Sequence, residues 1–406
     1  MKHIYLFNEG SFASLYGIGT YMEQLIRSLQ GRTDFSLNVV LLHAEKDEFT
    51  IEKVDGVRTF YLPLVRRSFS TNISVYMRNA WYLLAPYIKT EAGDALIFHL
   101  NYPAEYSFIE WMKRDFPFCQ IVFTVHFLKW FHLLKGDVER FKAVVGKGGG
   151  ETTEENQLYD LYREEVLLYR RVDKVICLAG YTYRLLRDYY KIEKEKIAWI
   201  YNGLEDRAIR VSPAKKKQLK RDLGIREDEK VVLYVGRMED MKGFDLLLHT
   251  FPLVLEKYPD VRLLVAGDGI FSQYLAECKG FRGKVIFAGR VDKEELYRFY
   301  QLADVGVITS RQEQCSYVAI EMMMFALPMI ISDIPALKEM TDQRIPAFPL
   351  SDKNDPSPQL AASIVDLLTR PTEIGMYCRK HYEEIFTLSR MGKDMEGVYD
   401  SAFSDK

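Results

Sequence analysis

The chain has 406 residues, of which 48% are hydrophobic and 28% are charged. This composition is typical of a folded globular protein, and the length predicts two domains of roughly 200 residues each. The formal net charge is -2, which excludes a general positive field that would recruit nucleic acid. No nucleic-acid partner is therefore expected.

The cysteine and hydropathy patterns exclude further classes. The five cysteines are scattered and form no C-x-x-C pair, so neither a disulfide framework nor a metal site is expected. The first apolar run ends at Asn8 and Glu9, which makes it too short for a signal peptide and predicts a buried strand instead. No stretch approaches the ~18–20 apolar residues that span a bilayer. A cytoplasmic location is expected.

Short apolar runs alternate with helical patterns through the first half of the chain. The expected strands are 2–7, 37–42, 57–62, 95–99, 120–125, 174–178 and 197–201, and the expected helices include 19–30, 73–90 and 104–115. The stretch 136–156 departs from this rhythm, because four glycines are followed by a run of Glu and Thr. We interpret it as a flexible flap over a site, with a disordered linker as the alternative.

The same rhythm restarts beyond residue 205. Strands are expected at 230–235, 261–266, 284–288, 304–308 and 328–331, with helices at 241–258, 270–279, 292–302, 316–326 and 357–369. The segment 202–230 is the expected junction, since Asn202-Gly203 is a turn signal. Its basic run, 215–221, is interpreted as a solvated helix face, because Leu219 and Leu223 recur at helical spacing. A phosphate or lipid patch is the alternative.

Strands that are apolar almost throughout are typical of parallel sheets covered on both faces. Their alternation with helices predicts an α/β protein made of doubly wound, Rossmann-like domains. We expect the first domain at 1–202 and the second at 203–370.

The clearest motif follows the strand 231–235. There Gly236 and Arg237 come directly after the strand, and Lys242 precedes the next helix. A glycine at a strand end lets a ligand approach the backbone, and open α/β sheets bind ligands at the carboxyl ends of their strands. An arginine can bind phosphate oxygens in a fork and a lysine adds a point charge. The motif predicts an anion site, although two solvated loop cations would give the same pattern.

A second motif lies at 311–328, where seven residues separate Glu313 from Glu321. Ser316-Tyr317-Val318 is the expected start of a helix, whose free N–H groups can bind a diphosphate. A carboxylate ahead of that helix can accept hydrogen bonds from sugar hydroxyls, and one inside it can reach a ribose. Glu321 stands in an apolar helix, so we expect it to have a polar partner.

Two histidines follow strands of the first domain, namely His99 and His126. Both positions are at the ligand end of a parallel sheet. A single histidine there is usually structural, but the succession of two favours a functional role for His126. Aromatic and polar neighbours make this region a candidate for binding a second substrate; the candidates are His99, Asn101, Tyr102, Phe127 and Trp130.

These segments together resemble the retaining glycosyltransferases of family 4, which have the two-domain GT-B fold. The resemblance rests on a strand ending G-R, followed by K-G and later by E-x7-E. Here these read G-R-M-E-D-M-K-G and E-Q-C-S-Y-V-A-I-E, with G-D-G at 267–269 and F-A-G-R-V at 287–291 between them. The resemblance covers essentially the whole chain and is strongest from 231 to 335. It implies two Rossmann-like domains that face each other across a cleft, with 371–406 crossing back onto the first domain.

The resemblance also implies roles for individual residues. Arg237 and Lys242 would contact the donor diphosphate, Glu313 the sugar hydroxyls and Glu321 the ribose. His126, with Arg237, Lys242 and Glu313, would form the catalytic set. The remaining expected donor-binding residues are Gly17, Gly19, Gly236, Gly267, Gly289, Arg290, Val291, Ser316, Tyr317 and Val318.

One segment departs from the family pattern. Gln314, Cys315 and Ser316 stand where the family has glycine, an aromatic residue and glycine. No histidine lies near Cys315 in sequence, which argues against a nucleophilic cysteine. The departure therefore bears on which sugar is bound.

The implied reaction moves a hexose-type sugar from a nucleotide-diphosphate sugar to an acceptor hydroxyl with retention, and a UDP-sugar is favoured over a GDP-sugar. Cations and a helix N-terminus can stabilise the leaving group without a metal, and the sequence contains no D-x-D pair. No cofactor is expected. The acceptor is a glycan, a lipid-linked sugar, a small molecule or a protein, and the chain is a monomer or dimer. Peripheral contact with the inner face of the membrane, through Arg66-Arg67 or 215–221, stays open.

Three alternatives to this reaction remain. Two are enzymes of the same fold, a nucleotide-sugar epimerase and a sugar phosphorylase. The third is a catalytically silent binding protein, against which the complete set of Arg237, Lys242, Glu313 and Glu321 argues.

Overall fold

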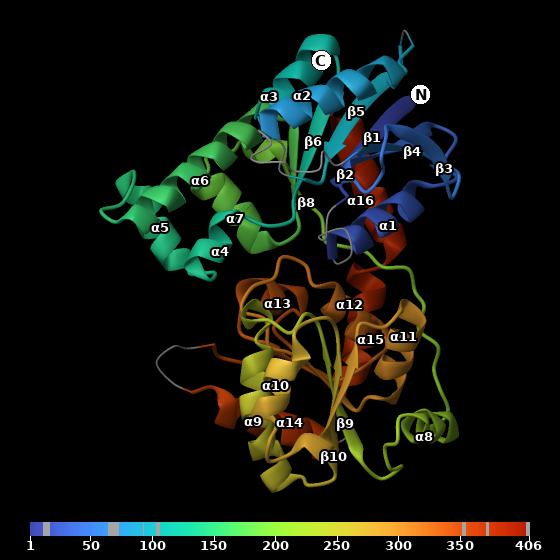
Figure 1. Ribbon diagram of the computed structural model, residues 1–406, viewed down its shortest axis with the longest axis vertical. Coiled ribbons are helices and arrows are strands. Elements are labelled where there is room, and N and C mark those ends of the chain that lie inside the picture. The colour runs from blue at the N-terminus through green and yellow to red at the C-terminus, as the bar shows by residue number, and fades with distance from the viewer. Residues whose placement is uncertain are drawn as a thin grey trace. The chain divides into compact units, whose positions relative to one another are not determined.

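The computed structural model describes residues 1–10, 17–63, 73–91, 93–102, 106–350, 355–370 and 373–402. Two compact units make up the chain (Figure 1). The first contains Met1–Gly203 together with the C-terminal segment that begins at Leu388, and the second contains Leu204–Thr387. Each unit is built around one largely or wholly parallel sheet.

The sheet of the first unit has the strand order β3-β4-β2-β1-β5-β6-β7-β8. Among the described strands of this sheet, only β3 and β4 pair in the antiparallel direction, through the two-residue turn Asp55-Gly56. The strands are β1 (Lys2–Glu9), β2 (Phe35–Ala44), β3 (Thr50–Val54), β4 (Val57–Pro63), β5 (Ala95–Leu100), β6 (Gln120–Val125), β7 (Lys174–Cys177) and β8 (Ile197–Trp199).

Helices cover both faces of this sheet, as two neighbouring residues of β5 show. Phe98 packs against Trp81 of α2 and Phe7 of β1, whereas His99 contacts Tyr399 of α16. Successive side chains of a strand point to opposite faces, so α2 and α16 lie on opposite sides. The helices of the unit are α1 (Gly17–Leu29), α2 (Ile73–Leu84), α3 (Tyr106–Asp115), α4 (Trp130–Leu134), α5 (Val138–Lys147), α6 (Thr153–Arg171), α7 (Gly180–Asp188) and α16 (Leu388–Ser401).

The second unit is a parallel six-stranded sheet in the order β11-β10-β9-β12-β13-β14. Numbered within the unit, this is 3-2-1-4-5-6, the order of dinucleotide-binding folds, whose ligand crevice lies where the order reverses, between β9 and β12. The strands are β9 (Lys230–Val235), β10 (Val261–Ala266), β11 (Val285–Gly289), β12 (Val305–Ile308), β13 (Met329–Ser332) and β14 (Ala347–Phe348). The helices are α8 (Pro213–Asp222), α9 (Phe244–Lys257), α10 (Phe271–Glu277), α11 (Lys293–Leu302), α12 (Tyr317–Met324), α13 (Pro335–Met340), α14 (Ser357–Thr369) and α15 (Ile374–Ile385).

The predicted two doubly wound α/β domains are confirmed, whereas two segments differ from expectation. The segment 371–406 is divided, because α15 packs on α12 within the second unit and only α16 belongs to the first. The expected flap 136–156 is largely helical. Asp137 caps α5, the left-handed Gly148 ends it, and Thr152 and Glu155 form a capping box that starts α6.

The helices and the basic segments of the chain bear on the membrane contact that the sequence left open. None of the helices within the described ranges is both long enough and apolar enough to cross a bilayer. In the basic run 215–221, Lys216 and Lys220 form ion pairs with Asp304. Arg66 and Arg67 lie outside the described residues.

Candidate functional site

The loops that follow β9 and β12 meet at the switch point of the second unit. Tyr234, the penultimate residue of β9, donates a hydrogen bond from its hydroxyl to the backbone oxygen of Arg237, 2.9 Å away. The loop then forms a short turn and reaches Lys242, whose backbone oxygen accepts a hydrogen bond from Thr309 Oγ1 at 2.9 Å. Thr309 follows β12 directly, so the two predicted motifs are joined at the crevice.

Glycines make this close approach of loops possible. Gly267 has a φ of +149°, and a Cβ there would lie 1.9 Å from the backbone oxygen of Gly236. Gly243 has a φ of +64°, and its Cβ would lie 2.2 Å from the backbone oxygen of Thr309. Any side chain at either position would push the loops apart. The predicted donor-binding residue Gly267 thus has a structural reason to be glycine, as does Gly243.

The cation and the first acid of the predicted set are bonded to each other. Lys242 Nζ lies 2.6 Å from Glu313 Oε1, and Ser310 Oγ donates to the same oxygen at 2.8 Å. The side chain of Lys242 is 27% exposed and that of Glu313 is 13% exposed. Arg237 belongs to the same loop and forms an ion pair with Glu239 at 2.8 Å. The site therefore presents charged groups that are already held in place.

Glu321 has the polar partners that its apolar helix led us to expect. Its side chain is 2% exposed on α12, and it forms an ion pair with Lys293 of α11. Tyr300, also on α11, donates its hydroxyl hydrogen bond to Glu321 Oε2 at 2.7 Å. A carboxylate can accept about four hydrogen bonds, so these two partners leave room for more.

The segment between the two acids is the start of α12. Ser316 is the N-cap residue, and its hydroxyl accepts a hydrogen bond from the backbone N–H of Ala319. Gln314 and Cys315, which depart from the family pattern, are both buried, as is Tyr317. Val318 is half-buried. Gly289 ends β11, and Arg290 and Val291 follow it. The backbone oxygen of Gly289 accepts a hydrogen bond from the backbone N–H of Gly267 at 2.8 Å.

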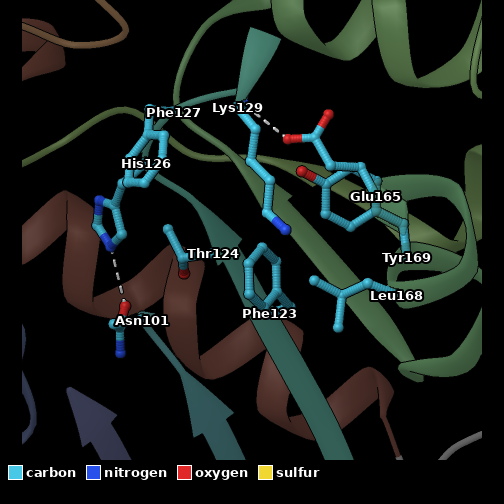
Figure 2. Close-up of a pocket in the computed structure, with 9 residues that line it drawn as sticks. All are labelled: Asn101, Phe123, Thr124, His126, Phe127, Lys129, Glu165, Leu168 and Tyr169. Atoms are coloured by element: carbon cyan, nitrogen blue, oxygen red, sulfur yellow. Dashed lines mark hydrogen bonds between the residues drawn. The ribbon is translucent and has the colours of Figure 1, made fainter. Parts of the chain in front are cut away.

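In the first unit, His126 and Asn101 meet at the ends of the neighbouring strands β6 and β5. His126 Nε2 lies 3.1 Å from Asn101 Oδ1, which makes Nε2 the protonated ring nitrogen (Figure 2). The ring of Tyr21 contacts that of His126 edge-on, with centroids 4.6 Å apart. Burial lowers the pKa of His126 to about 3, because the charged imidazolium loses its hydration. His126 is thus a neutral hydrogen-bonding group.

Two of the predicted acceptor residues are wrong. His99 is fully buried, and its Nδ1 and Nε2 lie 2.7 Å from the hydroxyls of Tyr399 and Thr124 respectively. Trp130 is also fully buried, stacks on Phe141 and donates its indole N–H to Tyr190. Both are therefore core residues. The prediction failed because the sequence does not indicate which face of the strand or helix is covered by helices distant in the chain.

The remaining predicted residues of the first unit take intermediate positions. Phe127 is 37% exposed and lines a pocket with Asn101 and His126, and Tyr102 is half-buried. The free volume of that pocket is about 10 Å³, which is room for about one water molecule rather than a sugar. Gly17 and Gly19 lie in the first turn of α1 rather than in a loop, and residues 11–16 before them are outside the described part of the chain.

Three residues of the two sites were missed by the sequence analysis. Lys293 and Tyr300 hold Glu321, and Glu165 of α6 lies beside the His126 pocket. The first two follow the predicted donor-binding residues Gly289, Arg290 and Val291, but nothing in their spacing indicates which acid they contact. Within the described ranges, no group of three or more His, Cys, Asp or Glu side chains is arranged to hold a metal ion.

Two family models match the chain. One, described as Glycosyltransferase Family 4, matches residues 16–207, and the other, described as Glycosyl transferases group 1, matches residues 229–370. An uncharacterized glycosyltransferase of Methanocaldococcus jannaschii is 32% identical over 173 residues, which are 41% of this chain and 44% of the relative. Mannosylfructose-phosphate synthase of Agrobacterium fabrum is 32% identical over 182 residues, 42% of this chain and 40% of the relative. The matched region thus spans less than half the length of these curated relatives.

Solved structures resemble the whole chain. Sucrose-phosphate synthase from Thermosynechococcus elongatus has a TM-score of 0.76 at 20% identity and covers 100% of both chains. HepE from Anabaena, in complex with UDP and glucose, has a TM-score of 0.71 at 14% identity, over 98% of this chain and 99% of that one. At these identities the likeness establishes a shared fold.

Proposed function

The chain belongs to the family 4, group 1 glycosyltransferases, and from that premise we propose that it transfers a hexose-type sugar from a nucleotide-diphosphate sugar to an acceptor hydroxyl. The observation that carries this proposal is the ion pair of Lys242 and Glu313 at the switch point of the second sheet. One group suits a phosphate oxygen and the other suits sugar hydroxyls. A UDP-sugar is the favoured donor, and the complexes of HepE with UDP and with UDP-glucose support that choice.

The charges of the second unit fit the demands of the leaving group. When the bond between the anomeric carbon and the diphosphate breaks, negative charge develops on the diphosphate oxygen. Lys242 and Arg237 supply positive charge, and the N-terminus of α12 adds the positive end of a helix dipole. Glu321 is proposed to accept hydrogen bonds from the ribose. Because these groups can stabilise the charge, we propose that no metal is needed.

The neutral groups of the first unit fit the other half of the reaction. We assign to His126 a hydrogen bond to the transferred sugar rather than the role of a base. Asn101 Nδ2 supports this assignment, because it is buried and has no hydrogen-bond partner in the described part of the chain, so it can donate to a ligand hydroxyl. The acceptor oxygen then forms its bond on the face that the diphosphate leaves, and its proton passes to the departing diphosphate oxygen. The configuration at the anomeric carbon is retained.

Ligand-induced thermal stabilisation tests the donor. A nucleotide sugar at 100 times its dissociation constant should add about 2.7 kcal/mol of stability. UDP-sugars and GDP-sugars are compared on the wild type and on Lys242→Ala, which should respond to neither. If no nucleotide sugar stabilises the wild type, the proposal is wrong.

Product analysis then separates transfer from the related reactions. Incubation with and without an acceptor panel should give nucleotide diphosphate together with a glycosylated product whose anomeric configuration matches the donor. Free epimerised sugar would indicate an epimerase, and sugar phosphate formed from inorganic phosphate would indicate a phosphorylase. Turnover should be unchanged after EDTA treatment, and a loss that Mg²⁺ restores would contradict the metal-free mechanism.

A further inference from the structure

Glu165 is a buried acid that the proposed reaction does not use. It lies on α6, it is 2% exposed, and it lines the same pocket as His126. A buried carboxyl group is costly unless its oxygens are hydrogen-bonded. Figure 2 shows Lys129 between His126 and Glu165.

Both oxygens of Glu165 are engaged at the start of α4. The backbone N–H of Lys129 donates to Oε1 at 2.7 Å, and the hydroxyl of Tyr190 donates to Oε2 at 2.6 Å. The same Tyr190 hydroxyl accepts the indole N–H of Trp130 at 3.0 Å. Two consecutive residues of the chain are therefore tied to one carboxyl group, the first directly and the second through Tyr190.

These bonds fix one end of the short segment that carries His126. His126 precedes Lys129 by three residues, and its own ring is held by Asn101 at the other end of the segment. The side chain of Lys129, the N-cap residue of α4, makes no capping hydrogen bond. Instead, the carboxyl group of Glu165 on α6 accepts the backbone N–H of Lys129. Without Glu165, the segment would keep its attachment to β6 and the exposed ion pair of Lys129 with Glu164, but it would lose its buried hydrogen bonds to α6.

We propose that Glu165 is a positioning residue that holds the 126–130 segment, and with it His126, in the geometry that sugar transfer requires. This proposal rests on the proposed function, since it assigns His126 to the transferred sugar. It also predicts a pH response, because the bonds that Glu165 makes depend on its charge. The ionised group accepts both hydrogen bonds, whereas the protonated group has one acceptor oxygen fewer.

The groups around Glu165 place its titration near neutral pH. Burial raises its pKa to about 7, while hydrogen bonds from Tyr190, Lys129 and Tyr169 act in the opposite direction. The side chain of Lys129 forms an ion pair with Glu164 at 2.9 Å. Burial keeps Tyr169 and Tyr190 neutral, and His126, with its pKa lowered to about 3, does not titrate in this range. A transition near pH 7 would thus report Glu165.

The experiment compares Glu165→Gln with the matched control Glu164→Gln. Glu164 is the adjacent residue on α6, is 61% exposed and pairs only with the Lys129 side chain among the contacts described. The wild type should gain turnover as the pH rises from 6 to 8. Glu165→Gln should lose this step and turn over about tenfold more slowly, because a small displacement of a catalytic group has effects of this size. The donor KM should stay unchanged, and Glu164→Gln should behave as the wild type.

A second readout does not depend on turnover. In the wild type the ¹³Cε1 resonance of His126, assigned with His126→Gln, should shift with a midpoint near pH 7, and Glu165→Gln should abolish that shift. Loss of turnover in every assay of the wild type with this NMR shift intact would count against the proposed function and not against the positioning. A folded Glu165→Gln with the wild-type pH profile and the wild-type NMR titration overturns the inference.

If Glu165→Gln does not fold, Tyr190→Phe serves in its place. It removes one hydrogen bond to the ionised carboxylate and leaves the acid buried. The midpoint of the pH profile should then move upward, since the ionised form has lost a donor. An unchanged midpoint in Tyr190→Phe would equally overturn the inference.

Discussion

Removing the Lys242 side chain separates its catalytic contribution from its contribution to stability. The ion pair with Glu313 is 2.6 Å long and mostly shielded from solvent, and a hydrogen bond between charged groups contributes about 1.5–3 kcal/mol to stability. In Lys242→Ala, Glu313 keeps the hydrogen bond from Ser310. We therefore expect a loss at the lower end, about 1.5–2 kcal/mol, and a decrease in Tm of a few degrees.

The expected catalytic loss is larger. If Lys242 contributes about 3 kcal/mol to binding the departing diphosphate in the transition state, turnover falls at least 100-fold at 25 °C. Release of nucleotide diphosphate measures turnover, and thermal unfolding measures stability on the same preparation. Lys338→Ala is the matched control, because Lys338 forms a 2.8 Å ion pair with Asp333 in the same unit and neither residue is assigned to the donor. It should lose little of either.

A double variant tests whether Lys242 acts only by holding Glu313. In that case Lys242→Ala/Glu313→Gln would be no slower than the slower single variant. We expect the double variant to be slower than both, since the two side chains are assigned to different parts of the donor. A folded Lys242→Ala within threefold of the wild-type rate would refute the assignment of the diphosphate site.

Further predictions concern donor affinity, acid stability and the crevice loops. Glu321→Gln should raise the donor KM about tenfold with a smaller change in kcat, as expected for a group that binds ribose in the ground state; an unchanged KM in the nucleotide-release assay would contradict that role. Burial lowers the pKa of His99 and of His126 to about 3, so the stability they contribute is present above about pH 6.5 and is lost as the pH falls toward 3. Melting curves from pH 7 to 4.5 should fall less steeply for His99→Gln than for the wild type, and equal slopes would argue against the shift. Gly267→Ala should destabilise the second unit by more than about 3 kcal/mol and Gly289→Ala by about 1–2 kcal/mol, because only the first Cβ meets a backbone oxygen; urea unfolding with similar midpoints for the two variants would show that the clash is relieved.

The buried parallel strands were predictable because most of their side chains are apolar. The strands 120–125, 230–235 and 261–266 have the predicted bounds. The edge strand β3, Thr50–Val54, was missed because three of its five residues (Thr50, Glu52 and Lys53) are polar, although Asp55-Gly56 is a hairpin signal. A strand that is buried on both faces is thus easier to predict from its apolar pattern than an edge strand that is buried on one face.

The error at 136–156 has a different cause. Four glycines suggested an irregular loop, but Gly148 serves as a helix end and two helices fill most of the segment. The pattern Thr152-x-x-Glu155 is a capping box and was visible in the sequence. The capping box therefore indicates the structure of this segment better than its number of glycines does.

The site was predictable where ligand contacts follow a strand end, and not where side chains meet through tertiary packing. Lys242 and Glu313 come from motifs at fixed positions after β9 and β12, and the structure brings them together. One partner of His99 is Tyr399, three hundred residues away in sequence. No periodicity predicts such a pair, because it depends on which helix covers which face of the sheet.

The functional groups of the second unit are charged and ion-paired, whereas those of the first unit are neutral, and this difference affects ligand binding. In the second unit, Lys242 and Glu321 are each paired with an opposite charge before any ligand is present. A donor must share or replace these partners, so its affinity should depend on ionic strength. In the first unit, the half-buried His126 and the buried Asn101 are neutral, and hydroxyl groups can bind them without displacing an ion. Salt should therefore weaken donor binding more than acceptor binding, and an acceptor KM that rises with salt as steeply as the donor KM would contradict this division.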